Sequence, residues 1–248
     1  MFNKIYGDLK KATLLFSFLI LVVSCNKEVS INFSEENKES SEPAIIAINY
    51  PKAEGTKEVA QRINDAVEGY IVNQTNLQAD SLSHLSIDDA IKRFHNSYKT
   101  FNSDFPETSL PWEALIDGEV TYRSADVISI AINSYLNTGG AHGNTHVKFL
   151  NFNPQTGKQY SKNDLIDDLD GLSKIIEEHL KKEMISKTDN QPMEDAFFGK
   201  DFQLPESLGF SDEGLIILYN PYEIASYAQG IIEFTVPFEA VGQFLNIY

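Results

Sequence analysis

The sequence predicts an α+β fold in which mainly antiparallel sheets and packed helices form two α+β subdomains. Two stretches with apolar residues at helical spacing come before residue 105, and a series of strand-like runs follows them. Because helices and strands come in separate runs and do not alternate as β-α-β units, mainly antiparallel pairing is expected. A chain of 248 residues is long enough for one large domain or two small ones, which need no metal or disulfide for stability.

The first 25 residues have the features of a bacterial export signal. Three lysines precede the apolar run Ala12–Val23, which is too short to span a bilayer comfortably. The four residues Val22–Cys25 resemble the lipobox of bacterial lipoprotein signal peptides, and a short N-terminal membrane anchor is the alternative. The resemblance implies that residues 1–24 are removed and that Cys25, the only cysteine, carries the lipid that attaches the protein to a membrane. The expected location is the cell envelope, either periplasmic or exposed at the surface.

The exported chain is strongly acidic. The full sequence has a formal charge of −16, and removal of residues 1–24 takes away three positive charges and one negative charge, which leaves −18. Such a surface repels phosphate backbones, so nucleic acid is not an expected partner. A basic partner would be attracted, although solubility alone is the alternative explanation.

The chain after Cys25 begins with a polar segment. Residues 25–42 have few apolar side chains and predict a flexible tether between the lipid and the folded part. The first subdomain is expected at residues 43–137. It opens with a strand, Ala44–Tyr50, which Pro51 is expected to end.

Two helices are expected next. Thr56 is a plausible N-cap for a helix whose apolar residues lie on one face, and Ser86 with Asp89 resembles the capping box of a second helix. Prolines between Phe105 and Pro111 end the helical pattern.

Three strands are then predicted, and the first two suit an antiparallel hairpin. In the middle strand isoleucines alternate with Ser129 and Asn133, which indicates a sheet with one face covered. The three strands are Trp112–Tyr122, Val127–Tyr135 and Thr145–Phe152.

The second subdomain is expected at residues 138–248. Its predicted elements are a helix at about Leu172–Ile185, a hairpin of Ser207–Phe210 with Leu215–Tyr219, a strand Ile231–Val236 and a short helix within Phe238–Leu245.

Catalytic and metal-binding patterns are weak. His142 and His146 follow Gly139-Gly140 at a spacing that could supply two zinc ligands, but no Glu lies between them in a His-Glu-x-x-His pattern and no third ligand is indicated. The glycines more simply permit a turn. No Gly-x-Ser-x-Gly nucleophile elbow is present in the sequence. We therefore expect no bound metal, no cofactor and no enzymatic activity.

Two segments carry a family resemblance. Tyr135–His142, which ends in Gly-Gly-Ala-His, and Asn220–Phe238 resemble the extracytoplasmic domain family of the RsiV anti-sigma factor. Residues from Ala44 to about Leu136 resemble the non-catalytic region of PdaC-type peptidoglycan deacetylases. The resemblance implies an α+β fold and an extracytoplasmic binding module, and the best-understood member binds lysozyme. The catalytic domain of the deacetylases has no counterpart here.

We therefore expect a lipid-anchored envelope protein that binds a basic protein such as lysozyme or a cell-wall glycan. Tyr222, Glu223 and Tyr227 are the candidate contact residues, and the loop that contains His142 is their expected neighbour. The alternative for these residues is structural: the tyrosines pack under the sheet and Glu223 caps a turn. The alternative functions are an enzyme or accessory module acting on peptidoglycan or another glycan, and a structural lipoprotein without a ligand.

Overall fold

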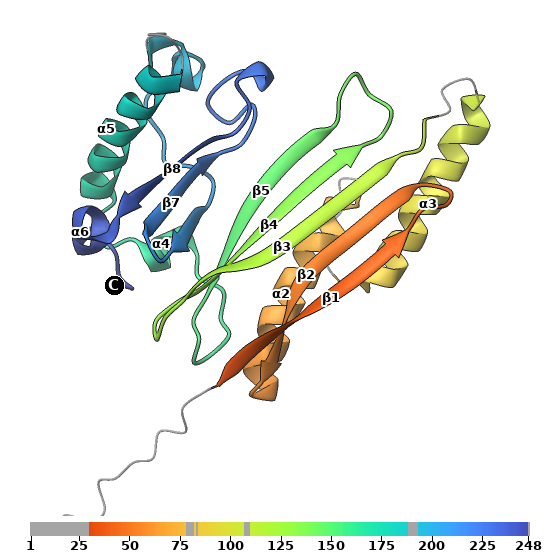
Figure 1. Ribbon diagram of the computed structural model, residues 1–248, viewed down its shortest axis with the longest axis horizontal. Coiled ribbons are helices and arrows are strands. Elements are labelled where there is room, and N and C mark those ends of the chain that lie inside the picture. The colour runs from red at the N-terminus through yellow and green to blue at the C-terminus, as the bar shows by residue number, and fades with distance from the viewer. Residues whose placement is uncertain (1–29, 78–81, 83, 107–109, 188–192, 248) are drawn as a thin grey trace, which may run out of the picture.

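The computed structural model describes residues 30–77, 82, 84–106, 110–187 and 193–247, and the predicted signal segment and Cys25 lie outside this part. Two mostly antiparallel sheets with helices confirm the α+β prediction (Figure 1). The larger sheet has the order β1 (Ile31–Ser40), β2 (Ile45–Gly55), β3 (Glu113–Arg123), β4 (Ile128–Asn137) and β5 (Asn144–Phe152). The smaller sheet has the order β6 (Leu208–Ser211), β7 (Gly214–Tyr219) and β8 (Ile232–Pro237).

Strand β1 lies inside the segment predicted as a tether, so that prediction is wrong from residue 31 to residue 40. The strand pairs antiparallel with β2 along its whole length, from Ile31 opposite Gly55 to Ser40 opposite Ile46. Only Ile31 is fully buried in it, and the guanidinium of Arg123 covers the ring of Phe33 at 5.5 Å. Backbone pairing holds this polar segment, and a low apolar content does not reveal such pairing.

Strand β2 continues through Pro51, which was predicted to end it. The ladder between β2 and β3 is parallel and extends only from Ile45 to Asn49 on β2. Pro51 lies beyond this ladder, so its missing N–H removes no hydrogen bond from it.

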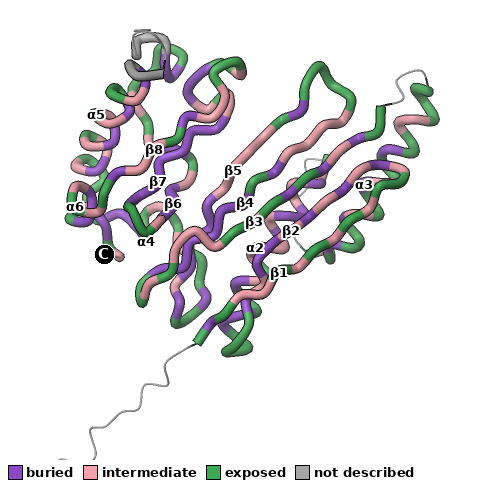
Figure 2. The backbone as a smooth tube through the Cα atoms, viewed as in Figure 1, coloured by how far each residue is buried: buried purple, intermediate pink, exposed green. Residues whose placement is uncertain are grey.

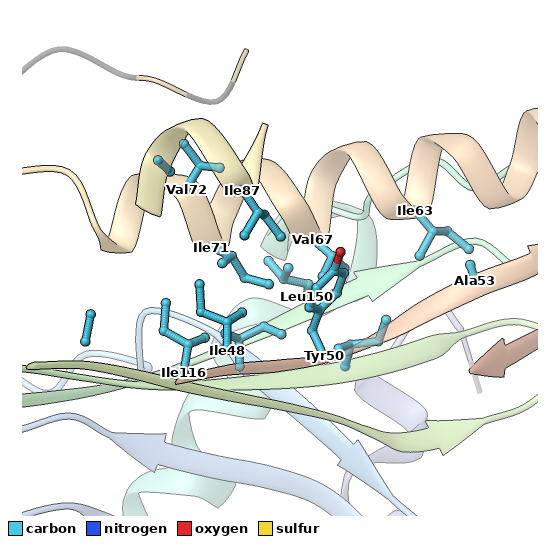
Figure 3. Packing of buried hydrophobic residues seen from close by; sticks show 14 of the residues in the cluster. Ile48, Tyr50, Ala53, Ile63, Val67, Ile71, Val72, Ile87, Ile116 and Leu150 are labelled. Carbon is cyan, nitrogen blue, oxygen red and sulfur yellow. The ribbon is translucent and has the colours of Figure 1, made fainter. Parts of the chain in front are cut away.

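Helices α2 (Lys57–Gln74) and α3 (Ile87–Asp104) begin at the predicted caps. The Ser86 hydroxyl accepts a hydrogen bond from the Asp89 N–H at 3.1 Å, whereas the Thr56 side chain makes no capping bond. Both helices lie on the same side of the larger sheet (Figure 1). Figure 3 shows Ile63 and Val67 of α2 pointing toward the sheet, where both are fully buried.

The second core lies between the smaller sheet and α5 (Leu169–Lys187). This helix, the β6–β7 hairpin and strand β8 match the predicted elements within a few residues. The chain ends with α6 (Phe238–Val241) and the 3₁₀ turn Gly242–Phe244, where a short helix was expected. The remaining short elements are α4 (Lys162–Leu165) and the 3₁₀ segments Met193–Gly199 and Tyr227–Gln229.

The smaller sheet covers part of the larger one. Ala131 of β4 and Phe149 of β5 form a buried cluster with Ile216 and Leu218 of β7. Ser129, with no exposed surface, accepts a hydrogen bond from the Phe210 N–H at 3.2 Å. The start of β4 is therefore buried on both faces (Figure 2), and the prediction that only one face is covered is wrong for this strand.

The division between the sheets falls after β5. The boundary expected at residue 138 separates β4 from β5, yet these strands pair from Ile128 opposite Phe152 to Leu136 opposite Asn144. None of the helices in the described ranges combines the length and apolar content needed to cross a bilayer.

Candidate functional site

The loop before β5 and the segment after β7 meet at one place on the molecule, as their candidate residues led us to expect. The Tyr227 hydroxyl donates a hydrogen bond to the Gly143 carbonyl at 2.9 Å. The imidazole of His142 stacks on the Tyr227 ring with 3.9 Å between ring centroids and 20° between planes. The ring Nδ1 of His142 lies 2.9 Å from the same Gly143 carbonyl oxygen, and this contact fixes the orientation of the imidazole.

Tyr222 lies beside this stacked pair, with its ring tilted relative to that of Tyr227. Its ring centroid lies 5.7 Å from that of Tyr227, and 56% of the residue is exposed. Its backbone has φ of 69°, in the left-handed region that L side chains rarely adopt. The structural alternative, in which Tyr222 packs under the sheet, is therefore wrong. We call His142, Tyr222 and Tyr227 the aromatic surface.

Glu223 holds the turn on which Tyr222 lies. One carboxylate oxygen accepts from the Asn220 N–H at 2.9 Å, and the other accepts from the Glu206 N–H at 2.6 Å. Because both oxygens already accept backbone hydrogen bonds, this carboxylate matches the turn-capping alternative better than a direct contact with a partner.

Asn220 attaches the same turn to the edge of the larger sheet. Its side-chain oxygen accepts from the Val147 N–H at 2.7 Å, and its amide nitrogen donates to the Val147 carbonyl at 3.0 Å. One amide thus satisfies both backbone groups of a residue on strand β5, as a neighbouring strand would. Asn220 is only 7% exposed, which makes this link part of the interior.

His146 belongs to a separate polar cluster. Its Nδ1 lies 3.1 Å from the Tyr70 hydroxyl of α2, and its Nε2 lies 3.3 Å from a carboxylate oxygen of Glu206. Lys148 contacts the other oxygen of Glu206 at 2.5 Å, and this hydrogen bond lowers the pKa of Glu206 below its ordinary value. Burial raises the pKa of Tyr70 far above its ordinary value, so the phenol stays protonated.

The two candidate zinc ligands thus have different partners. His142 contacts Tyr227, and His146 contacts Tyr70 and Glu206. No group of three or more His, Cys, Asp or Glu side chains arranged for a metal ion occurs among the residues described.

Gly143 has a specific steric role beside the aromatic surface. A Cβ at this position would lie 2.3 Å from the ring of Tyr135, so the tyrosine lies directly against the glycine backbone. The sequence reasoning missed Tyr135, Tyr70, Glu206 and the bonding role of Asn220. Only Asn220 had a local signal, the Asn-Pro turn. The contacts of Tyr70 and Glu206 with His146 join residues far apart in the chain.

Comparison with known families divides the chain into two regions. Residues 34–145 match the family model described as "Deacetylase PdaC", and residues 161–239 match "Protein of unknown function (DUF3298)". The chain therefore combines a PdaC-type region with a DUF3298 region. This composition agrees with the family resemblance, and it fits an extracytoplasmic envelope protein. Comparison with curated proteins gives no significant match.

Two solved structures share the fold. A DUF3298 family member from Bacteroides fragilis NCTC 9343 is similar at 16% identity and a TM-score of 0.59. A DUF3298 family protein from Pseudomonas aeruginosa PAO1 is similar at 17% identity and a TM-score of 0.57. Each match covers 88% of this chain and 94% of the other. At these identities the likeness concerns the fold alone.

Proposed function

We propose that this chain is a lipid-anchored binding protein of the cell envelope and that its aromatic surface contacts a basic protein such as lysozyme. The pairing of a PdaC-type region with a DUF3298 region supports the envelope location. The lipobox resemblance at Cys25 supports the anchor, and the acidic charge supports the choice of a basic partner.

The observation that carries the proposal is the exposed ring of Tyr222 beside the stacked rings of Tyr227 and His142. A left-handed backbone costs an L residue about 1–2 kcal/mol, and an exposed ring offsets little of that cost through burial. Folding stability therefore does not explain a tyrosine at this position. A tyrosine ring offers large contact area at low entropy cost, and rigid aromatic side chains are frequent hot spots of protein interfaces.

The neighbouring residues keep the stack rigid before a ligand arrives. Tyr227 is bonded to Gly143 of the β4–β5 loop, and Glu223 accepts two backbone hydrogen bonds beneath Tyr222. Because a preorganised surface loses little side-chain freedom on binding, more of the contact energy remains as affinity.

A biosensor experiment tests the proposal with lysozyme as the probe. The chain from residue 26 onward, which contains every strand of both sheets, is immobilised and exposed to lysozyme at low and at physiological salt. We expect retention at micromolar concentration and weaker retention at higher salt, because the Debye length falls from about 30 Å at 0.01 M to about 8 Å at 0.15 M. The bound lysozyme should also lose muramidase activity.

The variant Tyr222→Ala tests the assigned surface. We expect its affinity to fall about thirtyfold or more, as for an interface hot spot. Phe105→Ala is the matched control, because Phe105 is 55% exposed and has an aromatic neighbour, Phe101, at 5.2 Å on the larger-sheet side. Equal losses in both variants would contradict the aromatic surface as the site, and no retention at all would remove lysozyme as the ligand.

A further inference from the structure

The outer face of strands β1 to β3 carries a groove whose lining includes none of the three aromatic surface residues. Helices α2 and α3 cover the opposite face of the larger sheet, and the smaller sheet packs against β4 and β5. An open groove of about 390 Å³ follows the uncovered face across four strands. Its lining includes Leu115, which is 39% exposed.

The strand register arranges the groove in two transverse rows, each with one residue from each of β1, β2, β3 and β4. The first row is polar and consists of Asn37, Asn49, Asp117 and Asn133. The second row consists of Glu39, Ala47, Leu115 and Tyr135. Three strand spacings of about 4.8 Å make each row about 14 Å long.

The polar row has unused hydrogen-bonding capacity. Asn49 donates to Asp117 at 2.9 Å, while its side-chain oxygen is buried and has no hydrogen-bond partner in the described ranges. Within the same ranges, no hydrogen bond engages the side chains of Asn37 and Asn133, which are both exposed. Each free amide offers two donors and one acceptor oxygen in a fixed plane.

We propose that this groove binds a neutral glycan chain. A sugar ring has an apolar C–H face and a rim of hydroxyl groups. The exposed Leu115 and the ring of Tyr135 suit the apolar face, and the amides of the adjacent row suit the hydroxyls, which both donate and accept hydrogen bonds. The length of the rows suits a short oligosaccharide lying across the strands.

The charges in the groove select among glycans. Glu39 and Asp117 are the charged side chains that line it, and both are acidic residues. These carboxylates would repel an acidic glycan bound in the groove, whereas a neutral glycan would meet no such repulsion. A basic peptide would find only two carboxylates, one of them already bonded to Asn49, so the amide-rich row favours the sugar.

Calorimetric titration tests the inference with defined probes. The chain from residue 26 is titrated with the hexasaccharides of N-acetylglucosamine and of glucose, and with an oligogalacturonate of similar length as the acidic comparison. We expect a neutral hexasaccharide to bind and the oligogalacturonate not to bind. Asn37→Ala and Asn133→Ala should each weaken binding about three- to tenfold, the loss expected for one hydrogen bond.

The matched control is Asn32→Ala, since Asn32 is also an exposed asparagine of β1 but lies outside the groove. Circular dichroism establishes that each variant is folded. Absence of binding by both neutral probes, equal affinity in the control and groove variants, or tighter binding of the acidic probe would overturn the inference. If the groove variants lower lysozyme retention while no sugar binds, the groove is part of a protein contact and the glycan assignment is wrong. Because the aromatic surface residues are unchanged in these variants, loss of sugar binding alone leaves the lysozyme proposal untouched.

Discussion

Replacement of Asn220 by Ala tests how the two sheets are held together. The change removes hydrogen bonds of 2.7 and 3.0 Å and leaves both backbone groups of Val147 without their partner. Each hydrogen bond contributes about 0.5–1.5 kcal/mol, and a buried group left unpaired costs about 1–3 kcal/mol. Val147 is only partly buried, so water reaches part of the vacated site. We expect the free energy of unfolding to fall by about 2–4 kcal/mol.

Urea unfolding followed by two signals measures this change and locates it. The single tryptophan, Trp112, lies in the core of the larger sheet, so its fluorescence reports that part, whereas circular dichroism reports the whole chain. If the smaller sheet detaches first in the variant, the circular dichroism transition will begin at lower urea than the fluorescence transition. Asn144→Ala, on the exposed start of β5, is the control and should change stability by less than about 0.5 kcal/mol. An equally small effect of Asn220→Ala would refute the linking role.

The remaining predictions concern the neighbouring loop and the polar cluster. Gly143→Ala should lower stability by about 1–3 kcal/mol in urea unfolding, because its Cβ meets the Tyr135 ring, whereas Gly140→Ala, with its nearest atom at 3.7 Å, should change little. Equal effects of the two would contradict the steric role of Gly143. Because the pKa of Glu206 is lowered in the folded protein, its carboxylate stabilises the fold at pH values above 4.5, the ordinary pKa of the group. This stabilisation is lost as the pH falls through the pKa of the folded state. Between pH 5 and 3 the wild type should therefore lose more stability than Lys148→Met, and parallel pH profiles would contradict that assignment.

The elements predictable from sequence are those whose signals are local. The hairpin of β3 and β4 has an apolar alternation and a polar turn, and the α3 cap has a hydroxyl and a carboxylate at the expected spacing. Strand β1 has no such signal, because its stability comes from pairing with β2 and its side chains are mostly polar. The burial of both faces of β4 likewise depends on β7, which lies about 85 residues away in the sequence.

The candidate site was predictable in its position and not in its chemistry. Tyr227 and His142 meet as expected, because two glycines and an Asn-Pro pair marked the turns that carry them. The role of Glu223 could not be resolved from sequence, since a carboxylate in a turn can face solvent or accept backbone N–H groups. Only the distances to the Asn220 and Glu206 N–H groups distinguish these roles.

The two proposed sites place different demands on the same fold. The aromatic surface requires the two sheets to stay together, because His142 comes from the β4–β5 loop and Tyr227 from the segment between β7 and β8. The groove uses four strands of the larger sheet alone, including β1, the strand nearest to the predicted lipid attachment. Loosening the sheet contact at Asn220 should therefore weaken lysozyme retention more than glycan binding. If the folded Asn220→Ala variant loses lysozyme retention and glycan binding to the same extent, the two ligands share a single site that spans both sheets.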